Sequence, residues 1–242
     1  MTSAFDQVRV VGIDGDDTLW HNEERYQWAQ QRLGEVVARH SEVPDLEERL
    51  LAVERRNLGL FGYGVKGFTL SIIETAIEVT GGEVSGREVQ ELVDLGRQML
   101  ETPVVLLEGA EEAVDRLARS GRRLVLLTKG DLFDQEARVA RAGIAHRFWQ
   151  VEVVSEKDEA TYRRVLERLD VDAAEFLMVG NSLRSDVLPP LAIGAAAVWV
   201  PYPLTWSHEH AERPADGARF AEIRSLSELP DLLSPSPLAG EG

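Results

Sequence analysis

The first apolar segment of the chain ends in a group of acids, and this combination restricts the possible folds more than any other feature. Residues 8–13 are short, rich in β-branched side chains and without polar alternation. This pattern is typical of a strand buried on both faces in a parallel α/β sheet. Asp14, Asp16 and Asp17 follow at the carboxyl end, where open α/β sheets bind ligands. Because a cation must offset their mutual repulsion, we expect a metal site. An Asp-rich turn or a helix N-cap is the alternative interpretation of these residues alone.

The later part of the chain alternates between strand and helix patterns. Apolar segments over 124–127, 151–154, 176–179 and 196–200 predict further strands, and 104–107 is also apolar. Four strands, the first included, end in polar residues suited to phosphate or metal chemistry: Asp14 and Asp16; Thr128 and Lys129; Lys157; Asn181 and Asp186. Because the carboxyl ends of parallel strands lie on one edge, we expect these residues to converge on one crevice.

A helical insertion is predicted between the first strand and residue 104. Apolar stripes at helical spacing cover 29–37, 46–53 and 89–93, the last opening after Ser85. Between them, the glycines of residues 59–67 are expected to break any helix. We expect this loop to serve tight packing between helices in preference to substrate contact.

Composition and charge exclude several classes of partner. The net charge of −16 argues against nucleic acid and against an anionic membrane surface, because both are polyanions. No apolar stretch approaches the roughly 20 residues that span a bilayer, and the N-terminus has no signal-like segment. We therefore expect a cytoplasmic protein with no membrane contact. Without cysteine there is no thiolate metal site and no thiol nucleophile. Residues 234–242 are poor in apolar side chains and are expected to be disordered.

The four strand-end groups resemble, in order and placement, the signature motifs of the haloacid dehalogenase-like (HAD) superfamily, and the chain resembles its phosphatase branch. The resemblance extends to about Leu233. It implies a Rossmann-like α/β fold, in which helices flank a parallel sheet and a small helical C1-type cap domain is inserted. The core domain would comprise residues 1–19 and 105–233, and the cap residues 20–104.

The resemblance also implies a role for each motif residue. Asp14 would be the nucleophile and Asp16 the general acid/base. Thr128 would donate a hydrogen bond to a phosphoryl oxygen, and Lys157 would compensate charge between Asp14 and the phosphoryl group. Asp186 would hold Mg²⁺ together with the Asp14 carboxylate and the Asp16 backbone carbonyl.

Several positions depart from the family pattern or stay open. Asn181 stands where Asp is common, so it would coordinate through its carbonyl, or hydrogen-bond a ligand water, without adding charge. Gly15 replaces a larger residue and predicts a looser turn between the acids. Asp17 replaces a common glycine and adds negative charge near the metal. Lys129 either binds substrate or is solvated.

The expected function is a magnesium-dependent phosphatase that hydrolyses a small-molecule phosphomonoester through an aspartyl-phosphate. The alternatives are a 2-haloacid dehalogenase-type hydrolase, a phosphoryl transferase acting on an acceptor other than water, and a non-catalytic HAD-fold binding or regulatory protein. Asp16 favours the phosphatase, because a halide leaving group needs no proton donor. No sequence feature predicts the substrate or the oligomeric state.

Overall fold

The computed structural model describes residues 5–204, 206, 209, 211–214, 217 and 219–234. In this part of the chain one parallel sheet has the strand order β3-β2-β1-β4-β5-β6. The predicted Rossmann-like α/β fold is confirmed. The strands are β1 (Val10–Ile13), β2 (Arg123–Lys129), β3 (Gln150–Val154), β4 (Phe176–Gly180), β5 (Ala196–Trp199) and β6 (Phe220–Glu222). Of the tail predicted to be disordered, residues 235–242 lie outside the described residues.

Helices cover both faces of the sheet, because side chains along each strand alternate between the two faces. Val11 and Ile13 pack in a core with α5 and α9, whereas Val10 packs in a second core with α7. This double burial explains the continuous apolar pattern of β1. The flanking helices are α5 (Ala110–Arg119), α6 (Leu132–Ala142), α7 (Glu159–Leu169), α8 (Leu188–Ala192) and α9 (Leu229–Leu232).

Four helices between β1 and β2 form a unit with its own apolar core. They are α1 (Glu23–Val37), α2 (Leu46–Phe61), α3 (Val65–Val79) and α4 (Gly86–Glu101), called the cap helices below. Leu33, Leu50, Ile72 and Leu92, one from each helix, are all buried in this core. Ser85 caps α4, as its position in the sequence predicts.

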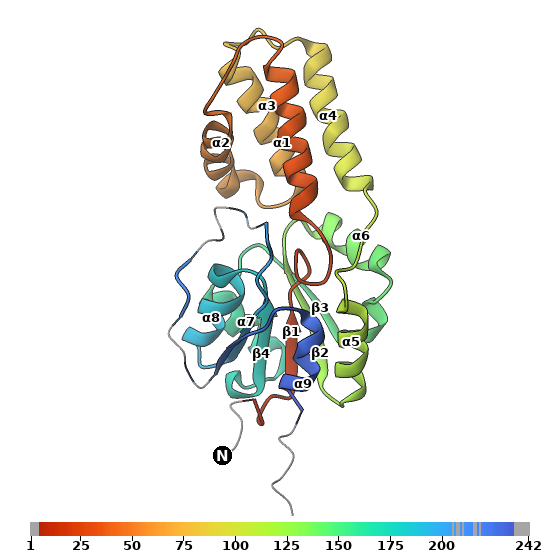
Figure 1. Ribbon diagram of the computed structural model, residues 1–242. Helices are drawn as coiled ribbons and strands as arrows, with labels where there is room; N and C mark the ends of the chain where they lie inside the picture. Colours follow the sequence, from red (N-terminus) through yellow and green to blue (C-terminus); the bar gives the residue numbers. More distant parts are fainter. Residues whose placement is uncertain are drawn as a thin grey trace, which may run out of the picture.

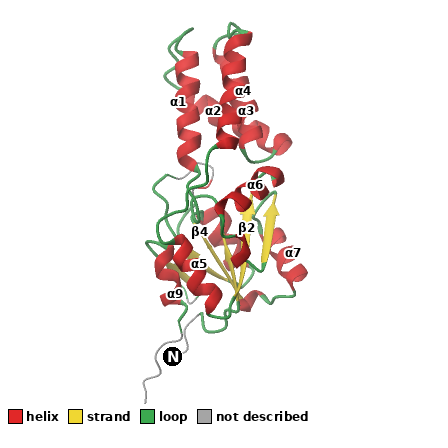
Figure 2. Ribbon diagram, turned by 90° about the vertical axis from the view of Figure 1, so that its right-hand side faces the viewer, coloured by secondary structure: helices red, strands yellow, loops and turns green. Residues whose placement is uncertain are grey.

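The cap helices stand over the carboxyl edge of the sheet, as Figures 1 and 2 show. The chain leaves β1 at this edge, enters α1, and returns from α4 to α5 before β2. The residues that follow the strands therefore face the cap helices. No helix in the described ranges is long and apolar enough to cross a membrane.

Candidate active site

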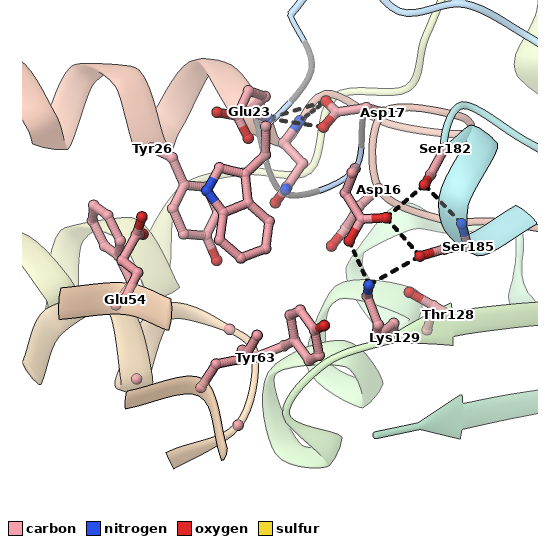
Figure 3. Close-up of a pocket in the computed structure, with 18 of the residues that line it drawn as sticks. Asp16, Asp17, Glu23, Tyr26, Glu54, Tyr63, Thr128, Lys129, Ser182 and Ser185 are labelled. Atoms are coloured by element: carbon pink, nitrogen blue, oxygen red, sulfur yellow. Dashed lines mark hydrogen bonds and ion pairs between the residues drawn. The ribbon is translucent and has the colours of Figure 1, made fainter. Parts of the chain in front are cut away.

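A cavity between the sheet edge and the cap helices collects the predicted site residues. The residues around it include every one predicted from the sequence: Asp14, Asp16, Thr128, Lys129, Lys157, Asn181 and Asp186. Figure 3 shows Thr128 and Lys129 at the end of β2, opposite Glu23, Tyr26 and Glu54 of the cap helices. Side chains from four strand ends and two cap helices thus meet at one place.

Lys157 joins the two most deeply buried carboxylates of the site. Its Nζ donates to Asp14 Oδ1 at 2.5 Å and to Asp186 Oδ1 at 2.7 Å, and all three side chains are almost fully buried. Burial raises the pKa of Asp14 to about 8, Lys157 opposes this rise, and Asp186 adds to it. Burial also disfavours charge on Lys157, but the two carboxylates together hold its pKa above the usual range. One lysine therefore offsets only part of the negative charge here.

The local backbone brings Asp186 towards Asp14. Asp186 lies in a π-helical turn, Leu183–Val187, which follows β4 and is capped by the Ser182 side chain. A Cβ atom on Gly180 would lie 2.3 Å from the Asp186 carboxylate, so only glycine permits this approach. Such π-helical turns occur frequently at functional sites.

The donor set fits a magnesium ion. The groups around this uncompensated negative charge are carboxylate and carbonyl oxygens, which Mg²⁺ prefers. The ion usually takes one or two carboxylates and keeps several waters. No group of three or more acidic or histidine side chains in the described ranges is close enough to hold a metal by itself. Asp14, Asp186 and the Asp16 backbone carbonyl are therefore the residues that would hold the ion, with water completing its shell.

The Asp16 side chain is held by residues of α6 and by an indole. Its carboxylate accepts hydrogen bonds from Trp20 Nε1 at 2.7 Å and from Gln135 Nε2 at 2.9 Å, and it forms an ion pair with the buried Arg138. Burial opposes ionisation, but Arg138, Arg25 and the two hydrogen bonds together hold the pKa of Asp16 below its usual value. Asp16 is therefore an ionised acceptor in this arrangement.

Thr18 connects Asn181 to Asp14. Its hydroxyl lies 3.3 Å from Asp14 Oδ2 and 3.4 Å from Asn181 Oδ1, and it accepts a hydrogen bond from the Asn181 backbone amide at 3.0 Å. The Asn181 side chain borders the cavity, and its Oδ1 is the atom that contacts this hydroxyl.

The two predicted substrate-binding residues of β2 differ in their surroundings. Thr128 is fully buried, and its hydroxyl has no hydrogen-bond partner among the described residues. Lys129 is not solvated: its Nζ contacts Glu209 at 2.5 Å and Ser185 Oγ at 3.1 Å, and it lies over the Tyr63 ring. Glu209 therefore neutralises Lys129, whereas the Thr128 hydroxyl is available to a ligand.

The two unusual residues of the first motif have structural roles. The turn at Gly15 is tightly packed, contrary to our expectation, because a Cβ there would lie 2.5 Å from the Trp20 indole. Asp17 adopts a left-handed φ of 61°, which Asp tolerates better than most residues. Its carboxylate accepts from the backbone amides of Asn22 and Glu23 at the start of α1.

The glycine-containing loop of the cap helices borders the cavity, and our prediction that it serves packing in preference to substrate contact stays a prediction. α2 continues to Phe61 and α3 begins at Val65, so the break is shorter than residues 59–67. Gly62, Tyr63 and Gly64 all line the cavity. Gly67 does serve packing, since a Cβ there would meet the Gly62 carbonyl at 2.7 Å.

Sequence reasoning missed the residues that reach the site from helices and from the segment after β5. These are Glu23, Glu54, Gln135, Arg138 and Glu209. A signal existed for two of them: Gln135 and Arg138 lie three residues apart on the buried face of α6, beside Val139. Polar residues on such a face need polar partners, so this spacing indicates a buried network.

A model of the haloacid dehalogenase-like hydrolase family matches residues 8–194. A solved haloacid dehalogenase-like hydrolase from Xanthomonas campestris is 44% identical, with a TM-score of 0.83; the match covers 93% of this chain and 90% of that protein. The 2-haloacid dehalogenase of Pseudomonas syringae pv. Tomato DC3000 is 24% identical with a TM-score of 0.62, covering 93% and 98%. At this identity the likeness concerns the fold alone.

Two curated relatives carry the same name, glyceraldehyde 3-phosphate phosphatase. The Pyrococcus furiosus protein is 23% identical over 235 residues, which are 94% of this chain and 92% of the relative. The Pyrococcus abyssi protein is 32% identical over 99 residues, or 39% of this chain. That second match spans less than half of the relative, 42% of its length.

Proposed function

The chain belongs to the haloacid dehalogenase-like hydrolases, and on this premise we propose that it is a magnesium-dependent phosphatase. It would hydrolyse a small-molecule phosphomonoester through an aspartyl-phosphate. The observation that carries the proposal is the buried contact of Lys157 with Asp14 and Asp186 in a cavity that Asp16 also borders. The relatives named glyceraldehyde 3-phosphate phosphatase support phosphate ester hydrolysis. The net charge of −16 supports a small substrate over nucleic acid or an anionic membrane surface.

The proposed reaction begins at the Asp14 carboxylate. One of its oxygens attacks phosphorus, the bond from phosphorus to the alcohol oxygen breaks, and Asp16 protonates the departing alcohol. Water then attacks the aspartyl-phosphate, Asp16 takes the water proton, and inorganic phosphate leaves with Asp14 regenerated. The ionised Asp16 held by Arg138 is in the form that the second step requires. Protonation for the first step requires loosening of these contacts.

The remaining residues bind the phosphoryl group and manage its charge. The Thr128 hydroxyl donates to a phosphoryl oxygen, which gives it the partner it lacks. Lys157 balances the charge between Asp14 and the phosphoryl group. When bound by Asp14, Asp186 and the Asp16 carbonyl, magnesium supplies charge neutralisation and orientation of the phosphate.

Aryl phosphate hydrolysis tests this function directly. We expect p-nitrophenyl phosphate turnover with magnesium and its loss in chelator. Equal turnover in chelator would contradict the metal requirement. Chloride release from 2-chloropropionate without aryl phosphate turnover would instead favour the dehalogenase.

Two substitutions separate the roles of the acids. Asp14→Asn should abolish turnover and the phosphoenzyme, because an amide is a poor nucleophile. Asp16→Asn should still form the phosphoenzyme from an activated aryl ester but turn over about 10²–10⁴-fold more slowly. Asp94→Asn, on the outer side of α4, is the matched control and should behave like wild type. Normal turnover by Asp14→Asn would refute the assigned nucleophile.

A further inference from the structure

The cap-side wall of the cavity carries two glutamates, Glu23 and Glu54, that lack a cationic partner among the described residues. The Glu23 side chain forms no hydrogen bond or ion pair among the described residues, and its charged neighbours Asp17, Glu54 and Asp16 are all negative. Glu54 accepts a hydrogen bond from Trp206, and no described cation pairs with it. Burial raises the pKa of Glu23 to about 8 and that of Glu54 to about 7. A cation between the two glutamates would stabilise their charged forms and so oppose the rise in their pKa values.

Each cationic side chain that lines the cavity in the described ranges already has an acidic partner. Arg25 lies 3.7 Å from Asp134 and donates to the Asn22 side chain and the Met99 carbonyl. Lys129 is paired with Glu209, and Lys157 with Asp14 and Asp186. In the described ranges, no cation that lines the cavity is therefore left to pair with Glu23 and Glu54, which favours a ligand as the source of positive charge.

Aromatic rings line the same part of the cavity. Tyr26, Tyr63 and Trp206 all border it, and Tyr63 meets Trp206 edge-to-face with ring centroids 6.2 Å apart. Figure 3 shows Tyr26 between Glu23 and Glu54, with Tyr63 below them. Aromatic faces attract ammonium groups through their quadrupoles, and neighbouring carboxylates add to this attraction.

Two buried side-chain oxygen atoms on α6 also lack a hydrogen-bond donor among the described residues. Gln135 Oε1 and Asp134 Oδ1 have no partner among the described residues, although the two side chains are only 3% and 2% exposed. Both residues line the cavity. Burial without a hydrogen bond is costly for such groups, so a donor on the ligand would satisfy them. They point to a ligand independently of the two glutamates.

We propose that the alcohol part of the substrate carries an ammonium group, which binds between Glu23 and Glu54 against the aromatic rings. This inference rests on the proposed phosphatase function, and it specifies the substrate as the phosphomonoester of a small amino alcohol. The phosphoryl end lies at Asp14, Lys157 and Thr128, and the ammonium end lies at the cap helices. A carboxylate at the ammonium end would face Glu23 and Glu54 and would be repelled.

Three esters of nearly equal size test the proposal, because they differ in the charge at one end. They are 2-aminoethyl phosphate, 2-hydroxyethyl phosphate and carboxymethyl phosphate, compared by kcat/KM at saturating magnesium. We expect the amine to exceed the neutral ester by about tenfold or more, and the carboxylate to fall below it by a similar factor.

Substitution of the two glutamates assigns the preference to them. In a Glu23→Gln/Glu54→Gln double variant the amine preference should shrink to within about twofold. Glu48→Gln, an exposed position on α2 outside the cavity, is the matched control and should keep the wild-type ratio. The ratio between esters is read within each variant, so a general loss of activity does not imitate the effect.

The possible failures are distinguishable. Turnover of p-nitrophenyl phosphate with equal kcat/KM for the three esters overturns the inference and leaves the phosphatase function standing. An amine preference that survives in the double variant overturns the assignment to Glu23 and Glu54. Absence of phosphate release from every ester, the aryl phosphate included, refutes the proposed function and the inference with it.

Discussion

Thr128 combines complete burial with a hydroxyl that has no partner among the described residues. A buried unsatisfied hydroxyl costs about 1–3 kcal/mol. We therefore expect Thr128→Val to keep or raise the free energy of unfolding, while kcat/KM for p-nitrophenyl phosphate falls about tenfold through the lost contact to the phosphoryl group. Urea unfolding and steady-state kinetics measure the two effects.

A buried threonine of the cap helices provides the matched control. Thr75 is also fully buried, but its hydroxyl donates to the Ser71 carbonyl at 2.8 Å. Thr75→Val should lose about 1 kcal/mol of stability and retain kcat/KM. If Thr128→Val keeps full activity, its hydroxyl does not contact the phosphoryl group.

A second test, of whether Asn181 lies near the metal and the substrate, changes only the charge at this position. Its side chain lies beside Thr18, which also contacts Asp14. Asn181→Asp adds a negative charge near Asp14 and Asp186, so we expect tighter magnesium binding and a higher KM for the anionic substrate. Separate titrations of magnesium and of p-nitrophenyl phosphate measure the two constants. If neither constant changes, Asn181 lies outside the range of both ligands.

The site residues that could be predicted are those placed by the sheet, since a parallel strand carries its last residue to a known edge. Thr128 and Lys157 follow from this rule. Arg138 and Glu209 do not, because the first reaches Asp16 from a helix and the second lies between β5 and β6, away from a strand end. Periodicity gives the face of an element but not its partner across the cavity.

At the scale of elements, Asp131 links α6 to the cap helices. It caps α6 by accepting from the Asp134 amide, and it forms an ion pair with Lys66 of α3 at 2.9 Å. Asp131→Ala should cost about 1 kcal/mol of stability through the lost cap. It should also raise KM about two- to fivefold, because the cap helices are held less firmly over the cavity.

Two variants separate these effects. Asp158 caps α7 in the same way, through the Thr161 amide, and forms no ion pair to the cap helices in the described part of the chain, so Asp158→Ala should lose stability and keep KM. Lys66→Met should raise KM with little change in stability, since exposed ion pairs contribute little. An unchanged KM in both Asp131→Ala and Lys66→Met would show that this contact does not hold the cap helices.

The elements differ in how well the sequence predicts them. The stripe at Ala29, Leu33 and Val36 is buried in α1 as expected. In contrast, α3 was not predicted, because its own apolar and small residues occur around most of the helix and leave no polar face at helical spacing. β6 was also missed, since it is a short edge strand held by pairing with β5 and not by an apolar run of its own.

At the scale of the whole molecule, the buried acids fall into two groups. Some are paired with a cation, and others line the cavity without a cationic partner among the described residues. Glu209 is held by Lys129, which together with hydrogen bonds from Ser182 and Ser185 lowers its pKa to about 2 against the effect of burial. Burial raises the pKa of Asp17 to about 7, as it does for Glu54, and that of Glu23 to about 8. These two groups of acids give opposite dependences of stability on pH.

A carboxyl group whose pKa is raised by folding keeps a proton that the unfolded chain has already lost. Between the unfolded value near 4 and the folded value of 7 to 8, the folded state therefore binds more protons, and the free energy of unfolding falls as pH rises. Glu209 acts in the opposite sense, because its stabilisation is present above its unfolded pKa and is lost as pH falls towards 2. In chelator, these groups together should thus make stability greatest near about pH 4, close to their unfolded pKa values.

Urea unfolding in chelator at about pH 5.5 and about pH 8 measures this dependence. We expect the free energy of unfolding to be roughly 1 kcal/mol or more lower at the higher pH. Glu23→Gln should reduce this difference, because it removes one of the acids that lose a proton inside the fold, whereas Glu48→Gln on the exposed side of α2 should leave it unchanged. A wild-type protein that is more stable at the higher pH would show that these cavity acids find a cation in the folded chain itself.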